Sequence, residues 1–177
     1  MKLLRASFCL FTLAALPLTL AQAGTDGTAA RLHEGYGLLH DLADQEKNAD
    51  GIFLFKHAPD ATKENVRQLV AVFKRIDHDT EAWLKADGLD PATAEHLPQV
   101  EAETRKAIQS QRAHEIFAVK GDPFDRLYLR LQEQSATYGM NLLAATRKYE
   151  GDAEREKALA AFERDLRRIK ARLDAQL

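Results

Sequence analysis

Histidines, carboxylates and hydroxyls are the side chains available for chemistry in this 177-residue chain, because its single cysteine, Cys9, lies in an N-terminal segment that we expect to be removed. In helical proteins, carboxylate-bridged metal pairs use a Glu-x-x-His step, which places both ligands on one face of a helix. No glutamate in this sequence is followed by a histidine three residues later. The sequence therefore lacks the usual signature of a di-metal site.

Four histidines remain as candidate metal ligands: His33, His40, His78 and His114. The first two are seven residues apart, so on one helix they would share a face and lie about 10 Å from each other. They could not chelate one ion without ligands from another helix. We favour a simpler interpretation, in which His33 and His40 form the polar flank of a helix.

The other two candidates have different surroundings in the sequence. His78 lies between Asp77 and Asp79, which would favour its protonated form. The chain has no Gly-x-Ser-x-Gly step to supply a nucleophile, so we favour a solvated face there over a hydrolytic base. His114 falls on the apolar stripe of a helix, and we expect a core histidine bonded to Gln111 or a tyrosine.

Three arginines follow one another at four-residue intervals near the end of the chain: Arg164, Arg168 and Arg172. They could form a basic stripe for an acidic partner. Acidic residues are interspersed among them, and Glu163 is placed to pair with Arg167. We therefore favour a solvated face that is balanced in charge.

The segments that position these residues read as helices, because apolar residues recur at helical spacing and no segment alternates with period two. The expected helices cover about 28–48, 59–87, 98–120, 122–150 and 152–177, and Gly or Pro residues mark the breaks between them. Residues 52–55 are read as a bend or helical extension pressed onto the core, and 89–96 as a connector. The sequence predicts an all-α fold, an antiparallel bundle of four to five helices.

Each helix has a predicted inner face. The second should bury Val66, Leu69, Phe73, Ile76, Thr80 and Trp83; the third Val100, Thr104, Ala107, Gln111, His114 and Phe117. The fourth should bury Phe124, Leu127, Tyr128, Leu131, Ser135, Tyr138, Leu142 and Ala145; the fifth Leu159, Phe162, Leu166, Ile169 and Leu173. Leu32, Tyr36, Leu39 and Ala43 form the stripe of the first. The tyrosines and the tryptophan on these stripes are expected to be core residues with a polar tip.

The first 23 residues have the three parts of a secretory signal. Lys2 and Arg5 precede an apolar run over 8–20, which is shorter than the roughly 20 residues that span a bilayer. Residues 21–23 are Ala-Gln-Ala, with small residues where a signal peptidase reads. We predict a signal at 1–23 cleaved after Ala23, one mature domain at 24–177, and periplasmic or secreted localisation. The alternative is an uncleaved N-terminal anchor.

Removal of this segment would change the chemistry of the chain. Cys9 would be lost, which leaves no disulfide, thiolate or lipid attachment point. The 25 basic and 27 acidic residues give a formal charge of −2, which becomes −4 because the segment carries two basic residues and no acid. That balance argues against a nucleic-acid partner, which requires a basic surface. No second apolar stretch is long enough for a membrane span.

Two segments resemble a known family. Residues 73–78 (Phe-Lys-Arg-Ile-Asp-His) with 81–84, and residues 121–128 (Gly-Asp-Pro-Phe-Asp-Arg-Leu-Tyr) with Gln132, resemble motifs of an exported bacterial ferritin-like domain family of unknown function. The resemblance covers roughly the last two-thirds of the chain and implies a ferritin-like up-and-down bundle in the periplasm or outside the cell. It implies no established enzymatic activity. The family's histidine four residues after the glutamine is Ala136 here, which weakens any inference of a metal site.

Three functions follow as hypotheses. We favour an exported helical-bundle protein with a binding or structural role in the cell envelope and no cofactor. The first alternative is a ferritin-like metal-binding or redox protein, with ligands drawn from the four candidate histidines. The second is a hydrolase, for which the sequence offers no motif. Formation of a homo-oligomer through the charged outer faces stays open.

Overall fold

The computed structural model describes residues 18–93 and 97–177, with side chains for residues 27–92 and 97–177. Its helices are α1 (Leu18–Glu46), α2 (Asp60–Ala86), α3 (Gln99–Ala118), α4 (Asp122–Arg147) and α5 (Ala153–Asp174), with 3-10 helices η1 (Ala49–Leu54) and η2 (Pro91–Thr93). The described residues contain no strand, so the predicted all-α fold is confirmed. The predicted signal lies mostly outside the described residues.

The helix ends follow the local signals of the sequence. Gly88 has a φ of 77° just after α2, and Gly121 has a φ of 65° just before α4. Residues with side chains adopt this left-handed region only rarely, so glycine suits both turns. The carboxylate of Asp152 accepts hydrogen bonds from the backbone N–H groups of Glu154 and Arg155 and caps the first turn of α5.

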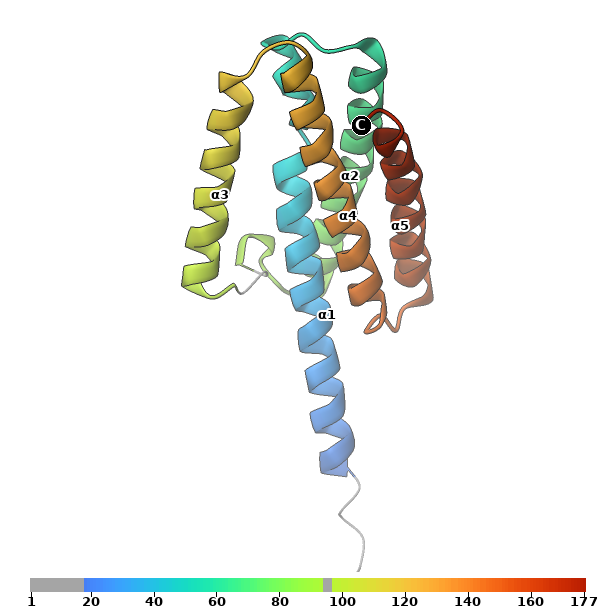
Figure 1. Cartoon of the computed structure of the whole chain (residues 1–177). Coiled ribbons are helices and arrows are strands. Elements are labelled where there is room, and N and C mark those ends of the chain that lie inside the picture. The colour runs from blue at the N-terminus through green and yellow to red at the C-terminus, as the bar shows by residue number, and fades with distance from the viewer. Residues whose placement is uncertain (1–17, 94–96) are drawn as a thin grey trace, which may run out of the picture.

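Four of the helices form the core of the bundle, as Figure 1 shows. α1 packs against α2 and α4, and α5 packs against the other sides of α2 and α4. Each of these neighbouring pairs is antiparallel (Figure 1). α3 carries the chain back along the length of the bundle, from the end of α2 to the start of α4, and lies outside the four-helix core.

The stripes predicted for α2 and α5 are confirmed. Val66, Leu69, Phe73, Ile76 and Thr80 of α2 are buried, and Trp83 packs at the edge of the core. All five predicted residues of α5 are buried: Leu159, Phe162, Leu166, Ile169 and Leu173. Leu69, Phe73 and Ile76 join the α5 residues in one apolar cluster with α1 and α4, whereas Val66 belongs to a second cluster with Phe124 and Tyr128.

The stripe predicted for α4 is wrong beyond Tyr128. The buried residues are Phe124, Tyr128, Leu129, Gln132, Ala136, Gly139, Leu143 and Thr146. Small residues occupy the centre of this face because the neighbouring helices come close to it: a Cβ added at Gly139 would lie 2.9 Å from a methyl group of Leu166. The larger Leu131 and Leu142 lie at the sides of the face and are only partly buried.

The predicted inner face of α3 is also wrong, because no residue of α3 is buried. Val100 and Phe117 are exposed, and so is His114, which we expected in the core. Tyr138 of α4, predicted as a core residue, is 42% exposed. The cause is the position of α3, which stands to one side of the four-helix core (Figure 1) and buries none of its own residues.

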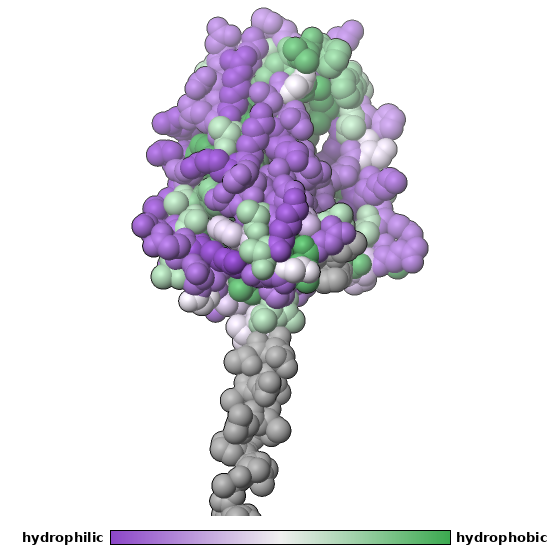
Figure 2. Space-filling model, turned by 180° about the vertical axis from the view of Figure 1, so that it is seen from behind, coloured by the Kyte–Doolittle hydropathy of each residue, from purple (hydrophilic) through white to green (hydrophobic). Residues whose placement is uncertain are grey.

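The surface is largely hydrophilic, with an apolar area at the end of the bundle where η1 lies (Figure 2). Residues 52–55 were expected to press onto the core. Ile52 and Phe53 do so, whereas Leu54 and Phe55 are 84% and 76% exposed. In the described part of the chain, no helix combines the length and apolar character needed to cross a bilayer.

Candidate functional site between the first two helices

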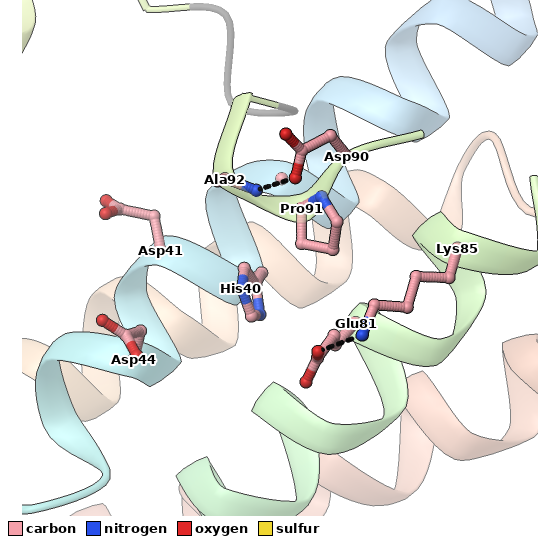
Figure 3. A pocket seen from close by; sticks show the side chains of 9 residues that line it. His40, Asp41, Asp44, Glu81, Lys85, Asp90, Pro91 and Ala92 are labelled. Carbon is pink, nitrogen blue, oxygen red and sulfur yellow. Dashed lines mark hydrogen bonds and ion pairs between the residues drawn. The ribbon is translucent and has the colours of Figure 1, made fainter. Parts of the chain in front are cut away.

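A groove lies where α1 and α2 are spanned by η2. It has a volume of about 530 Å³. Its walls are Gly37, His40, Asp41 and Asp44 of α1, Glu81 and Lys85 of α2, and Asp90, Pro91 and Ala92 around η2. Figure 3 shows these side chains around a shared opening. We call this surface the α1–α2 groove.

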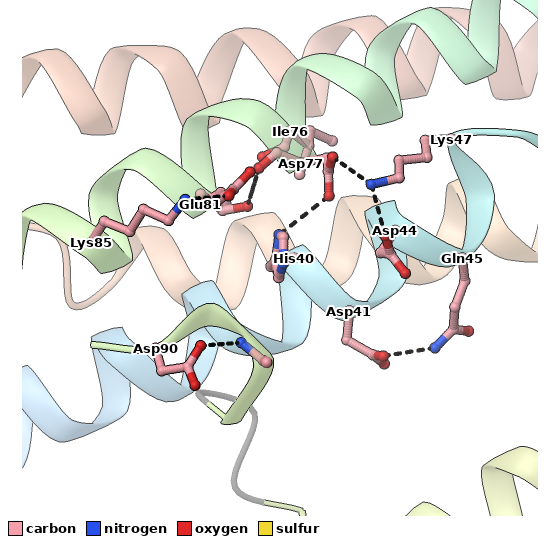
Figure 4. Close-up of polar contacts among 12 residues, drawn as sticks. His40, Asp41, Asp44, Gln45, Lys47, Ile76, Asp77, Glu81, Lys85 and Asp90 are labelled. Atoms are coloured by element: carbon pink, nitrogen blue, oxygen red, sulfur yellow. Dashed lines mark hydrogen bonds and ion pairs between the residues drawn. The ribbon is translucent and has the colours of Figure 1, made fainter. Parts of the chain in front are cut away.

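His40 links the groove to a buried carboxylate behind it. Its Nδ1 atom lies 3.2 Å from Oδ1 of Asp77 on α2. Both side chains are largely buried, yet neither of these two atoms makes a hydrogen bond with the described residues. Figure 4 shows His40 facing Asp77 across the interface between the two helices. The arrangement orients the imidazole electrostatically and leaves hydrogen-bonding capacity free.

Lys47 completes the ionic network. Its Nζ atom lies 2.9 Å from Oδ2 of Asp77 and 2.7 Å from Oδ1 of Asp44, as Figure 4 shows. These two carboxylates raise the pKa of Lys47. On the opposite wall, Lys85 pairs with Glu81 and lowers the pKa of its carboxyl group. Lys47 and Glu81 therefore keep their charges at neutral pH.

The groove has an excess of negative charge. Four carboxylates line it, from Asp41, Asp44, Glu81 and Asp90, whereas Lys85 is the one lysine among the described lining residues. Carboxylates on facing walls attract cations, and the hollow shape focuses the field into the opening. The carboxylates come from three different segments, so they suit a ligand with more than one positive group better than a single small ion.

The structure does not bring the four candidate histidines together. His40 lines the groove, but His33 lies two helical turns away and pairs with Asp87 through Nε2 at 3.2 Å. The expectation of polar flanks fits both residues: His40 faces Asp77 of α2, and His33 faces Asp87, which directly follows α2.

His78 and His114 lie on exposed surfaces elsewhere. The side chain of His78 is 82% exposed and its Nδ1 lies 2.9 Å from Asp79, which raises its pKa as the sequence predicts. His114 contacts the carbonyl oxygen of Ser110 through Nδ1 at 2.7 Å, not Gln111 or a tyrosine. Across the residues that the structure describes, no three His, Cys, Asp or Glu side chains are grouped closely enough to hold a metal ion.

Sequence reasoning missed most of the groove. The sequence analysis considered Asp77 only for its effect on His78. Asp77 directly follows the buried Ile76, however, and so lies at the edge of the α2 stripe. That position was the available signal for a half-buried carboxylate. Nothing in the sequence links Lys47 to Asp77, because the two are 30 residues apart and meet only when α1 packs on α2.

The chain matches no protein-family model, no curated protein and no solved structure.

Proposed function

We propose that this chain is an exported protein of the cell envelope whose α1–α2 groove binds a small organic cation carrying more than one ammonium group. The observation that carries the proposal is the set of four carboxylates on the walls of a groove of about 530 Å³. Ammonium groups joined by methylene chains could reach carboxylates on both walls at once. His40, held against Asp77, would supply a polar contact at the back of the groove.

The export part of the proposal depends on residues 1–23. When the full chain is expressed in a bacterium, we expect it in the periplasmic fraction, with a mass that begins at Gly24. Intact chain retained in the membrane fraction would favour the uncleaved anchor instead.

Binding can be tested with spermidine as the probe. Isothermal titration of the mature chain at low ionic strength should give saturable binding that weakens with added salt, because screening reduces attraction between exposed charges. The variant Asp44→Asn/Glu81→Gln removes one carboxylate from each wall and should weaken binding about tenfold or more, which corresponds to about 1.4 kcal/mol.

A matched control variant has the same net charge as Asp44→Asn/Glu81→Gln. Glu34→Gln/Glu64→Gln also removes one acid from α1 and one from α2, but both of these residues are exposed and lie outside the groove. Its affinity for spermidine should stay within about twofold of the parent chain. If the two double variants lose affinity equally, the interaction is only with net charge and the groove is not the site.

We also propose that the chain is related to ferritin-like proteins, on the basis of the two sequence motifs that resemble that family. The proposal is supported by the single long connection through α3 between two helix pairs, since ferritin-like bundles also have one long crossover. The metal-binding alternative predicts that Zn²⁺, Fe²⁺ or Cu²⁺ is retained after desalting and that His40→Ala releases it. A hydrolase would need a nucleophile beside His40, and the described groove lining contains no Ser, Thr or Cys.

A further inference from the structure

A second groove lies between α3 and the four-helix core, on the other side of α1. Two adjoining hollows of about 340 and 350 Å³ form it. The residues common to both are Gln45 and Glu46 of α1, Gln109 and Arg112 of α3, and Ser135 of α4. We call this surface the α3 groove. It exists because α3 crosses beside the core without burying any of its own residues.

The floor of the α3 groove contains a buried hydrogen-bond acceptor without a donor. Gln132 of α4 lines the groove and is only 5% exposed, and its Oε1 atom makes no hydrogen bond with the described residues. Its side chain bonds to the carboxylate of Glu46, which also accepts a hydrogen bond of 2.6 Å from the hydroxyl of Ser135. A buried carbonyl that lacks a donor is costly, and a ligand donor would satisfy it.

The walls above this floor are apolar and cationic. Ile116 of α3 and Leu131 of α4 line one of the two hollows, and Ile108 of α3 lines the other. Arg112 lies at the rim, where its guanidinium group contacts the side-chain oxygen of Gln134 at 3.5 Å. A guanidinium group packs well on the face of an aromatic ring, so these walls suit a flat, apolar body.

The charges of the groove disfavour ionic ligands of either sign. The carboxylate of Glu46 on the floor would repel an anion, and Arg112 and Arg105 on the α3 side would repel a cation. Burial raises the pKa of Glu46, against the opposing effects of Ser135, Gln132 and Arg112, so this carboxylate lies in a desolvated environment. A neutral molecule with a hydrogen-bond donor meets all of these conditions.

We propose that the α3 groove binds a small hydroxylated aromatic molecule. Its ring packs between the apolar walls and against Arg112, and its hydroxyl group donates to Oε1 of Gln132. This inference is independent of the α1–α2 groove, because neither Gln132 nor Arg112 lines that groove.

The test uses para-cresol as the probe and its methyl ether as the matched ligand without a donor. In ¹⁵N-labelled mature chain, para-cresol should shift amide signals of α3 and α4 around the groove in a saturable way. The methyl ether should bind about tenfold more weakly, the usual scale for loss of one hydrogen bond in a buried site. Gln132→Met should weaken para-cresol binding by a similar factor and remove the difference between the two ligands.

A second variant is needed because Gln132 is buried and its replacement could impair folding. Ala113→Trp fills the groove from an exposed position of α3, so it should abolish para-cresol binding while the chain stays folded. Ala107→Trp places the same ring on α3 outside the groove and should leave binding unchanged. Equal affinity for the two ligands in the parent chain, or unchanged binding in Ala113→Trp, would overturn the proposal.

Discussion

Glu46 of α1 shows at the scale of one residue how burial and partners compete. Burial disfavours its charged form and raises its pKa, while hydrogen bonds from Ser135 and Gln132 and the nearby charge of Arg112 act in the opposite direction. The carboxylate therefore costs stability when it ionises, even though it is hydrogen-bonded. Such a group beside the unsatisfied Oε1 of Gln132 is typical of a binding site, since both are costly without a ligand.

Replacement of Glu46 by glutamine should stabilise the fold in a pH-dependent way. The pKa of Glu46 is higher in the folded state than its ordinary value of 4.5, so its favourable contribution is present at low pH and is lost as the pH rises through the folded-state value. The gain in Tm of Glu46→Gln over the parent chain should therefore be larger at about pH 7.5 than at about pH 4. Thermal unfolding by circular dichroism measures it, with the exposed Glu64→Gln as control. A gain that is larger at low pH would contradict the assignment.

At the scale of secondary-structure elements, α1 and α4 approach each other closely at Gly35. A Cβ atom added at Gly35 of α1 would lie 2.5 Å from Oγ1 of Thr146 on α4. Thr146 is buried and its hydroxyl donates a 2.9 Å hydrogen bond to the carbonyl of Leu142, so it has little freedom to move. The contact between α1 and α4 thus depends on the absence of a side chain at position 35.

Gly35→Ala should destabilise the protein by about 1–2 kcal/mol, because overpacking outweighs the gain in helix propensity of about 1 kcal/mol. Gly27→Ala is the matched control on the same helix: an added Cβ there meets no atom within 4 Å, so no loss is expected. Urea unfolding of both variants gives the comparison. Equal stabilities would mean that α1 and α4 can separate at this point without cost.

α3 differs from the other helices in how it is held. Its backbone packs against α4, and its links to α1 are polar, such as Arg105 to Asp41 at 3.9 Å. With no buried residue of its own, α3 should open locally without unfolding of the core. Its amide hydrogens should exchange at least about tenfold faster than those of α2 and α5 in native-state hydrogen exchange. Equal protection of α3 and α5 would show that α3 unfolds only with the whole bundle.

At the scale of the whole molecule, one ionic cluster joins three helices at the end of the bundle away from η1. Arg155 of α5 donates two hydrogen bonds, of 3.1 and 3.2 Å, to the carboxylate of Asp87 after α2, and His33 of α1 contacts the same carboxylate. The guanidinium group also lies over the rings of Tyr36 and Trp83. Burial acts to raise the pKa of Asp87, but the hydrogen bonds and charges of Arg155 and His33 together outweigh it, so the pKa of Asp87 is lowered.

Asp87→Asn should therefore lower the free energy of unfolding by about 1–2 kcal/mol at neutral pH. This loss is larger than that for an exposed ion pair and smaller than that for a fully buried charged hydrogen bond, because the cluster is partly buried. For a chain of this size that corresponds to a fall in Tm of roughly 2–8 °C. Because the pKa is lowered in the folded state, the contribution is present above the ordinary value of 3.8 and is lost as the pH falls below it. Asp174→Asn, which removes an exposed pair with Lys170, is the control and should change Tm little. A loss that persists unchanged at about pH 3 would rule out this ionic mechanism.

The sequence by itself determined the helices, most of their ends and three of the inner faces, since the stripe predicted for α1 also lies in the core. The start of the first helix is an exception, because α1 begins at Leu18 and not at about residue 28. Leu159 to Leu173 of α5 and Val66 to Ile76 of α2 are large apolar residues at helical spacing, and such stripes are buried in almost any bundle. Gly88 and Gly121 ended or preceded helices as expected, because few other residues adopt those backbone angles.

Only the tertiary structure decided which faces meet and which polar residues come together. On α4, the side chains that allow neighbouring helices to approach are small or polar, such as Ala136 and Gly139, and a count of large apolar residues overlooks them. On α3, the predicted stripe is exposed, because no residue of this helix is buried by the part of the chain that the structure describes. His40 and Asp77 lie on separate helices, and the periodicity of one helix does not predict which residues of another helix it will contact. The four histidines were therefore visible in the sequence, whereas their separation, and the acidic groove beside one of them, required the packing of α1 on α2.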